Sequence, residues 1–253
     1  MNIISINKDN IDNEHICCAI SNKESDICVS SKKKWMKKQF ENGLVFKRLD
    51  ARGKVFIEYI PAENAWCPIE AEDYMFINCF WVSGQYKGQG YANELLNECM
   101  EDARAKHKKG ITILSSNKKM PFLSDPKHLK YKGFQVCDTA KPYFELLYLP
   151  FKDDAAKPKF KDCCKNATTD EKNMVLYYSN QCPHTEKYAP LIAEIAKEKG
   201  LDVLIKKIDS KEQAQNAPTP FTTYSFFNKG AFVTNEIFSE KKFIKFIEAN
   251  VKK

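Results

Sequence analysis

The chain has 253 residues, 43% of them hydrophobic, and a formal net charge of +7. This apolar share excludes a wholly disordered protein and allows one or two packed cores. No apolar run reaches the ~18 residues of a membrane-spanning helix, and the first residues lack the basic head and apolar stretch of a signal peptide. We therefore expect a cytoplasmic protein without a membrane partner.

The charge surplus comes from lysine, which makes point contacts to phosphate. No nucleic-acid-binding motif accompanies it, so we expect no nucleic-acid partner. Ten cysteines are present, and no pair has the Cys-x-x-Cys spacing of zinc and dithiol sites. We therefore expect reduced thiols and no bound metal, and the oligomeric state stays open.

The predicted elements alternate between strands and helices, which indicates an α/β fold. In chain order, the first part contains a strand over 2–6, helices over 9–20 and 33–42, strands over 44–50, 54–60 and 74–82, a helix after Gly90, a strand over 111–115, a helix over 122–132, and strands over 134–138 and 143–149. The second part contains a strand over 174–178, a helix that stops at Gly200, a strand over 203–208, a hairpin over 222–235 and a helix over 240–251.

The composition changes once between these two parts. Residues 152–173, KDDAAKPKFKDCCKNATTDEKN, are polar and carry a single aromatic side chain. Such a stretch is typical of a linker. We therefore predict a first domain over 1–151, a linker over 152–173 and a second domain over 174–253.

Glycine is concentrated in one turn. Three of the nine glycines fall within residues 84–90, between the apolar strand 74–82 and an amphipathic helix. Glycines let the backbone approach a ligand closely, and the first N–H groups of a helix attract anions such as pyrophosphate. The alternative is that these glycines only tighten the packing of the strand against the helix.

The run VSGQYKGQGYA, residues 82–92, resembles the acetyl-CoA motif of the GNAT N-acetyltransferases, V-x-P-x-x-[Q/R]-G-x-G-x-[G/A]. Gly84 replaces the common proline, and Lys87 replaces the usual Gln or Arg. A register shifted to Gln85 matches the short motif but misplaces Val82 and Ala92. The resemblance extends to the order of elements over residues 1–150 and implies a mixed central sheet with flanking helices.

The same resemblance implies acetyl-CoA as co-substrate and assigns residues to it. The strand backbone at Trp81 and Val82 would hold the pantetheine arm, and Asn117 would contact the cofactor. Lys118 and Lys119 would reach a phosphate or remain surface lysines. The backbone that would hold the pyrophosphate belongs to Lys87, Gly88, Gln89, Gly90, Tyr91, Ala92 and Asn93.

Acetyl transfer to an amine also needs a base and an acid. In many family members the general acid is a tyrosine in a Leu-Tyr-x-x-x-Gly-Phe pattern, and the position of that tyrosine here is occupied by Leu129. Tyr131, two residues later, is therefore either the acid or a packing side chain. Glu58, inside an apolar strand, is the candidate base; it is either edge-exposed, which we expect, or buried with a raised pKa. Glu63 and Glu70 are further candidates.

The second part resembles a small thioredoxin fold, and the whole chain resembles the YoaP family of acetyltransferases. Cys182 matches the active cysteine and Pro220 the cis-proline, whereas Thr185 replaces the second cysteine. A cysteine at the start of a helix has a lowered pKa, so Cys182 would be a reactive thiolate. Cys163 and Cys164 would resolve it or share a soft metal or metalloid ion with it. The alternative is a non-catalytic module.

These features lead to one main functional hypothesis and one rival. The main hypothesis is an acetyl-CoA-dependent N-acetyltransferase that acts on a small-molecule or protein amine. The rival is a thiol redox or metal-handling protein that uses Cys182 and in which the first domain only senses acyl-CoA. The identity of the acceptor amine is not predicted, because acceptor pockets in this fold come from variable loops.

Overall fold

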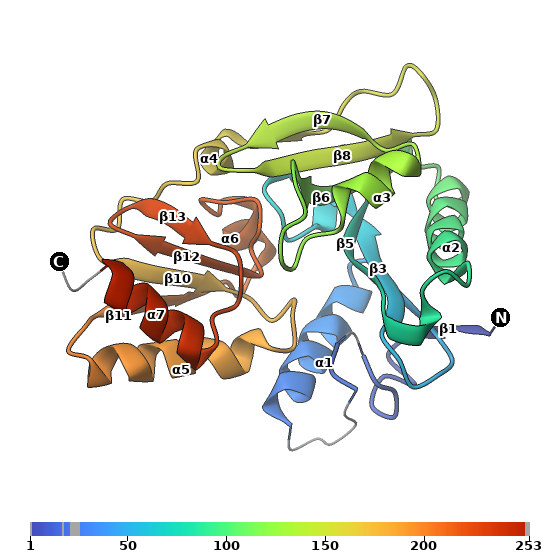
Figure 1. The fold of residues 1–253 in the computed structure, drawn as a ribbon. Coiled ribbons are helices and arrows are strands. Elements are labelled where there is room, and N and C mark those ends of the chain that lie inside the picture. Colours follow the sequence, from blue (N-terminus) through green and yellow to red (C-terminus); the bar gives the residue numbers. More distant parts are fainter. Residues whose placement is uncertain (1, 17, 21–25, 251–253) are drawn as a thin grey trace.

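A seven-stranded sheet forms the larger half of the computed structural model, which describes residues 2–16, 18–20 and 26–250 (Figure 1). Its strand order is β1-β2-β3-β5-β6-β8-β7. β5 and β6 are paired in parallel, and the other neighbours are antiparallel. The strands are β1 (Ile3–Ile6), β2 (Val45–Leu49), β3 (Val55–Pro61), β5 (Tyr74–Val82), β6 (Gly110–Ser116), β7 (Gln135–Ala140) and β8 (Phe144–Pro150). This mixed sheet with flanking helices confirms the predicted fold class.

Helices cover both faces of the large sheet. α1 (Ile27–Phe40) packs through Trp35 and Met36 on one face, while α2 (Tyr91–Ala105) and α3 (Pro126–Tyr131) pack on the other. The alternation of β3 accounts for the two cores, because Phe56 faces α1 and Ile57 faces α2.

The parallel strands β5 and β6 separate along their length. They are paired only from Tyr74 opposite Gly110 to Ile77 opposite Ile113, whereas β5 continues to Val82. A β-bulge in the pairing of β5 with β3 sets Glu58 opposite Cys79 and Tyr59 opposite Ile77. Beyond Ile77, the edge of β5 that faces β6 is therefore open, and Asn78 stands at the point where the strands part.

A four-stranded sheet, in the order β11-β10-β12-β13, forms the second half (Figure 1). β10 and β11 are parallel, and β12 and β13 complete the sheet in antiparallel pairs. Helices α5 and α7 pack together on one face through Ile192, Phe243 and Ile247. The elements are β10 (Met174–Tyr178), α5 (Thr185–Glu198), β11 (Val203–Lys207), α6 (Lys211–Gln215), β12 (Tyr224–Asn228), β13 (Ala231–Thr234) and α7 (Glu240–Asn250).

The segment predicted to be a linker contains packed elements. β9 (Lys159–Phe160) pairs with β4 (Ile69–Glu70), and α4 (Asp162–Lys165) follows. Phe160 and Cys164 are buried in a core cluster that also takes in Ile208 and Ala214 from the second half. The polar composition of residues 152–173 could not reveal these contacts, because they are made with residues far away in the sequence. The contacts join the cores of the two sheets.

The two halves also exchange hydrogen bonds. The Thr222 hydroxyl donates to the Trp66 carbonyl, and the Cys67 thiol donates to the Pro220 carbonyl at 3.3 Å. Asn235 is fully buried, accepts a bond from the Tyr143 hydroxyl at 2.6 Å and donates to the Pro121 carbonyl at 2.9 Å. The second half therefore holds the loop that precedes α3.

One predicted helix is wrong. Residues 9–16 and 18–20 form turns and an isolated bridge, and residue 17 lies outside the described residues. The Asn7 side chain accepts hydrogen bonds from the backbone of Asp9 and Asn10, and the Asn10 side chain accepts one from the Asn7 backbone. Asparagine bonds of this kind compete with helix formation.

Two other helices have different bounds from those predicted. α1 begins earlier, at Ile27, because the Asp26 side chain accepts a hydrogen bond from the Cys28 backbone. α3 begins only at Pro126, where Asp125 is the N-cap. Residues 122–125 are therefore a loop and not the start of a helix. Among the described residues, none of the helices combines the length and the apolar composition that a membrane span requires.

Candidate functional site

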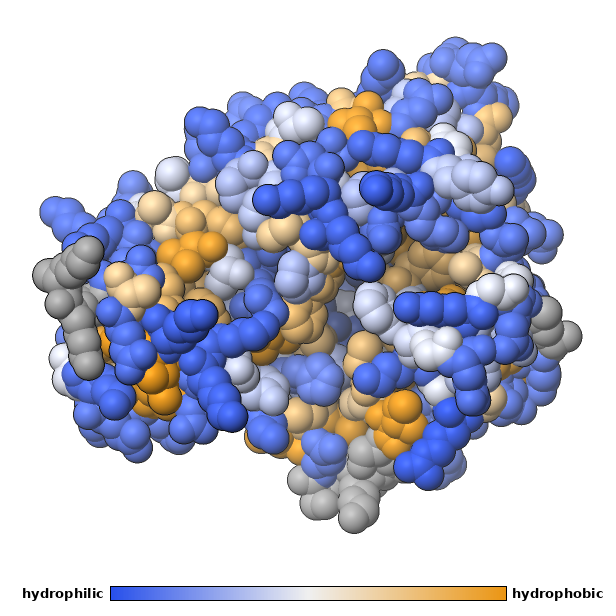
Figure 2. Space-filling view, in the orientation of Figure 1, coloured by the Kyte–Doolittle hydropathy of each residue, from blue (hydrophilic) through white to orange (hydrophobic). Residues whose placement is uncertain are grey.

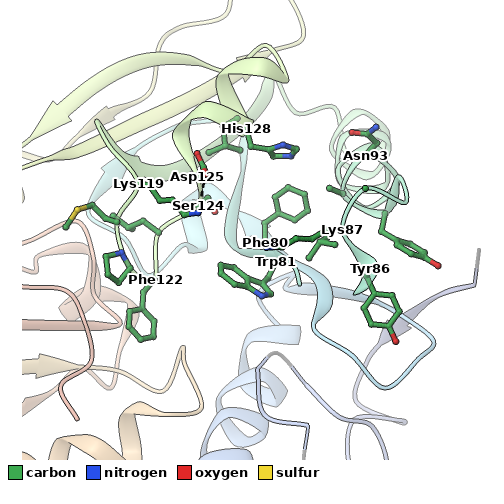
Figure 3. Close-up of a pocket in the computed structure, with 18 of the residues that line it drawn as sticks. Phe80, Trp81, Tyr86, Lys87, Asn93, Lys119, Phe122, Ser124, Asp125 and His128 are labelled. Atoms are coloured by element: carbon green, nitrogen blue, oxygen red, sulfur yellow. Dashed lines mark ion pairs between the residues drawn. The ribbon is translucent and has the colours of Figure 1, made fainter. Parts of the chain in front are cut away.

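A cavity of about 870 Å³ opens where β5 and β6 separate (Figure 3). We call it the first cavity. Its walls come from the end of β5, the glycine turn, the first turn of α2, the loop before α3, and α3 itself. The strand separation is thus the structural cause of the cavity, since a continuous sheet would fill this space with backbone hydrogen bonds.

The glycine turn gives the first cavity the features of an anion site. Gly88 has a φ of 77°, and a Cβ added there would meet nothing within 4 Å. Gly90, with a φ of 87°, is the N-cap of the 15-residue helix α2 and offers no side-chain cap. The first N–H groups of α2 are therefore presented to the cavity rather than to a side chain, together with the positive end of the helix dipole.

Most residues predicted to bind the cofactor line this cavity, and two do not. Gln89 turns away, and its side-chain amide donates to the Gln85 carbonyl at 2.5 Å. Asn117 is exposed outside the cavity, and of its two lysine neighbours only Lys119 lines the wall. The predicted residues that do line it are Trp81, Val82, Lys87, Gly88, Gly90, Tyr91, Ala92 and Asn93.

His128 is a cavity residue that sequence reasoning missed. Figure 3 shows its ring extending from α3 toward α2, and the ring centroid lies 6.2 Å from that of Phe80. Its Nε2 atom is buried and has no hydrogen-bond partner among the described residues. Burial, and then the charge of Lys132, lower the pKa of His128 below its usual 6.5, so the ring is neutral at pH 7. The sequence signal that could have identified it is its position directly before Leu129, the residue that matches the tyrosine position of the family.

Tyr131, the predicted acid, lies on the solvent side of α3, away from Leu129. Its side chain is 82% exposed and does not line the cavity. Leu129 faces the core, and two further residues turn a helix by about 200°. Pro126 is the first residue of α3. The structure therefore contradicts a catalytic place for Tyr131.

A second cavity, of about 450 Å³, adjoins the first. Both are lined by Phe80 and Trp81 of β5 and by residues 122–124 of the loop before α3. Its remaining walls come from both halves of the chain, including Trp66 on one side and residues 181–184 and 220–223 on the other. Figure 2 shows apolar side chains gathered along the hollow in the middle of this face.

Glu58 lies at the wall of the second cavity and is buried, which corrects the expectation of an exposed carboxylate. Lys32 of α1, also fully buried, forms an ion pair with it at 2.7 Å. The side-chain amide of Asn78 donates to the other carboxylate oxygen at 3.1 Å. α1 covers this face of β3, which is why Glu58 is enclosed. Glu63 and Glu70 are exposed and line neither cavity.

Cys182 also lines the second cavity, but as a neutral thiol. Burial raises its pKa to about 12 and outweighs the backbone hydrogen bond at His184 that lowers it. This environment opposes the predicted reactive thiolate. The expected cis bond before Pro220 is wrong, because within the described residues the cis peptide bond is Lys141–Pro142.

Cys163 and Cys164 are placed apart from Cys182. Cys164 is buried and donates to the Lys161 and Pro68 carbonyls, while Cys163 is exposed beside Gln215. No group of three or more His, Cys, Asp or Glu side chains in the described part of the chain could hold a metal ion. These positions oppose the shared metal or metalloid site of the rival hypothesis.

Comparison with known proteins gives matches to both halves. The model of the acetyltransferase (GNAT) family matches residues 12–121, and the YoaP-like family model matches residues 203–245. The uncharacterized N-acetyltransferase YoaP of Bacillus subtilis (strain 168) is 44% identical over 244 residues, which cover 96% of this chain and 97% of that protein.

Two solved structures are similar to this chain at much lower identity. The GNAT N-acetyltransferase YhbS of Escherichia coli, in complex with CoA, is 14% identical with a TM-score of 0.39, over 64% of this chain and 89% of that one. A GNAT acetyltransferase of Brucella melitensis, in complex with acetyl-CoA, is 11% identical with a TM-score of 0.37, over 62% and 91%.

Proposed function

This chain belongs to the GNAT family of N-acetyltransferases, and from that premise we propose that it transfers the acetyl group of acetyl-CoA to an amine that enters from the second cavity. The observation that carries the proposal is the junction of the two cavities at Phe80 and Trp81. One cavity has the glycine turn at its wall, and the other is lined by residues of both halves of the chain.

The first cavity suits acetyl-CoA in charge and shape. The backbone of residues 87–93 would hold the pyrophosphate, because it combines two positive-φ glycines with an uncapped helix start. The open edge of β5 at Trp81 and Val82 would pair with the pantetheine arm. This places the thioester near Phe80, at the entrance to the second cavity.

The chemistry forms a bond between the amine nitrogen and the acetyl carbon and breaks the bond from that carbon to sulfur. The proton that the nitrogen loses has to reach the departing sulfur. His128 is our candidate for carrying it, because its neutral ring lines the first cavity and its buried Nε2 has no partner among the described residues. Glu58 is less suited to be the base, since Lys32 already faces it at 2.7 Å.

Acetyl-CoA should raise the melting temperature of the protein, because a ligand that binds only the native state stabilises it by mass action. Gly90→Glu should abolish this rise, since its carboxylate would occupy the pyrophosphate site. Gly200→Glu is the matched control: Gly200 also has a positive φ, of 68°, with nothing within 4 Å of an added Cβ, and it lies after α5. An unchanged melting temperature for the wild type at millimolar acetyl-CoA would refute the proposal.

We further propose that residues 174–253 form a thioredoxin-like domain that walls the acceptor side and carries no redox chemistry of its own. The strand order β11-β10-β12-β13 and the parallel pair joined by α5 support the likeness. The Thr185 hydroxyl, at the position of a second cysteine, donates to the Ser179 and Cys182 carbonyls and so helps to fix the turn before α5.

Iodoacetamide should alkylate Cys163 before Cys182 at pH ~7.5. Among the described cysteines Cys163 is the exposed one, whereas the Cys182 thiol has a pKa raised to about 12. Peptide mass spectrometry over a time course gives the order of labelling. Faster labelling of Cys182 would restore the redox hypothesis for this domain.

A further inference from the structure

Lys54 is a half-buried basic residue in the lining of the second cavity. It lies directly before β3, and its carbonyl accepts a hydrogen bond from the Ser83 backbone at 3.1 Å, which continues the antiparallel pairing of β3 with β5. Side chains alternate between the two faces of a strand, so Lys54 stands on the same face as Glu58, which lines this cavity as well.

The same pairing shows how far Lys54 lies from the junction of the two cavities. Val55 is opposite Val82, so Lys54 is opposite Ser83, and Trp81 is its diagonal neighbour on the same face. Diagonal neighbours across antiparallel strands are about 7–8 Å apart, a distance that a lysine side chain can span. Trp81 lines both cavities. An anion bound by Lys54 would therefore lie close to the proposed position of the thioester.

Among the described residues, nothing neutralises the Lys54 ammonium inside the cavity. It forms no hydrogen bond or ion pair with them. Glu58 is the acidic side chain of the lining, and Lys32 already faces it at 2.7 Å. Asp26 lies outside the lining, where its side chain caps α1. The wall of the second cavity therefore has a surplus of positive charge.

The charge of Lys54 acts on lining residues from both halves of the chain. His184 belongs to the second half, and burial, followed by the Lys54 charge, lowers the pKa of His184 below its usual 6.5. Its ring is therefore neutral at pH 7. In the first half, the Lys54 charge opposes the rise that burial causes in the pKa of the Cys18 thiol. The ammonium is thus close to both parts of the wall.

The remaining polar side chains of the wall are neutral. Those of Asn78, Gln181 and Thr222 donate hydrogen bonds within the protein. The hydroxyls of Ser124 and Thr223 have no partner among the described residues, but a hydroxyl both donates and accepts, so they favour neither sign of charge in a ligand. Burial raises the pKa of each lining thiol, which keeps it protonated. The thiols are those of Cys18, Cys67, Cys79 and Cys182.

Aromatic rings make up most of the rest of the wall. The volume of about 450 Å³ is that of a site for a small molecule. A ligand that fits this cavity therefore combines a compact apolar body with a negative charge for Lys54. The aromatic side chains are Trp66, Phe76, Phe80, Trp81, Phe122 and Phe221.

We propose that the acceptor is a free α-amino acid with an aromatic side chain, whose carboxylate pairs with Lys54 and whose amine is acetylated. This inference rests on the proposed function and names its acceptor class. One carbon separates the amine from the carboxylate in an α-amino acid, so a carboxylate held by Lys54 keeps the amine near Trp81.

The Lys54 ammonium also assists the reaction, because a like charge disfavours the protonated form of the amine beside it. The free lone pair of the nitrogen forms the bond to the acetyl carbon, and the bond from that carbon to sulfur breaks. The proton that the nitrogen loses ends on the sulfur of CoA.

Aromatic amino acids and their decarboxylated partners test the role of the carboxylate. The pairs are L-phenylalanine with 2-phenylethylamine, L-tyrosine with tyramine, and L-tryptophan with tryptamine, with each N-acetyl product measured by mass spectrometry. We expect kcat/KM for the best amino acid to exceed that of its own partner by about tenfold or more, the effect of a hydrogen bond between charged groups. Glycine, which keeps the carboxylate but has no ring, should be acetylated at least about tenfold less efficiently.

Three results of this panel would overturn the inference. They are no acetylation of any aromatic amino acid, equal or greater kcat/KM for the partner without the carboxylate, and equal or greater kcat/KM for glycine.

Lys54→Met tests the residue itself, because methionine keeps an unbranched side chain and removes the charge. The ratio of kcat/KM within the best pair should fall by about tenfold or more, and the different basicities of the two amines cancel when this ratio is compared between enzymes. The control is Lys38→Met, the same change at an exposed position of α1 that lines neither cavity. It should keep the wild-type ratio. An unchanged ratio in Lys54→Met, or an equal fall in the control, would contradict a pair between Lys54 and the carboxylate.

The acetyl-CoA-induced rise in melting temperature separates this inference from the proposed function. Lys54 does not line the first cavity, so Lys54→Met should keep the rise in full, which also shows that the variant is folded. An intact rise together with an unchanged ratio would overturn the inference alone. No rise in the wild type would instead refute the proposed function, and the inference with it.

Discussion

His128→Phe should lower kcat by ~10²-fold or more while the affinity for acetyl-CoA changes little. Phenylalanine keeps an aromatic ring against Phe80, where the two centroids are 6.2 Å apart, but it cannot accept or donate a proton. Steady-state kinetics with the preferred amine measure kcat, and the acetyl-CoA-induced shift in melting temperature measures binding.

Tyr131→Phe is the control for this experiment, because the Tyr131 side chain belongs to the same helix but is 82% exposed and does not line the first cavity. It should retain wild-type kcat. A His128→Phe enzyme with more than half of the wild-type kcat would remove His128 from the mechanism, and loss of activity in Tyr131→Phe would return the acid role to Tyr131.

The pH profile gives an independent check on His128. Burial lowers its pKa, so its neutral form persists to a pH below 6.5. If the neutral ring takes the amine proton, kcat should be independent of this group at neutral pH and should fall as the pH drops through the lowered pKa. In His128→Phe this acid limb should be absent. An acid limb of the same shape in the variant would belong to another group.

Lys32→Ala should destabilise the protein by ~3–5 kcal/mol, the usual effect of removing one partner of a buried ion pair. Both side chains of the Lys32–Glu58 pair are at most 1% exposed, so the substitution leaves the Glu58 carboxylate buried without the ammonium that faces it. Urea denaturation followed by circular dichroism measures the free energy of unfolding.

Lys37→Ala is the matched control on the same helix. Lys37 also forms an ion pair at 2.7 Å, with Asp12, but the two side chains are 42% and 58% exposed to solvent. Solvent-exposed pairs contribute about 0–1 kcal/mol. Equal losses of stability in the two variants would show that the buried pair does not hold α1 onto β3.

Local patterns in the sequence were sufficient for the elements around the first cavity. The apolar run of β5 and the helix after Gly90 were predicted within a few residues, because strand and helix periodicities are properties of short segments. The glycine turn was predicted for the same reason.

The errors at the second cavity came from contacts between residues that lie far apart in the sequence. The exposure of Glu58 was misjudged because α1, which begins 31 residues earlier at Ile27, covers that face of β3. The pKa of Cys182 was misjudged because the helix start at which it lies is enclosed against the first half of the chain. The second cavity escaped prediction altogether, since no single segment supplies more than part of its wall.

The hydrogen bond from Thr222 to Trp66 joins residues that are 156 positions apart. Because the walls of the second cavity are so far apart in the sequence, the two cavities form at different stages of synthesis. Every residue that lines the first cavity precedes residue 130, whereas the wall of the second cavity is complete only at residue 223. A growing chain thus completes the glycine turn well before the second cavity. Until residues 220–223 have left the ribosome, the cavity that we propose for the acceptor amine lacks part of its wall.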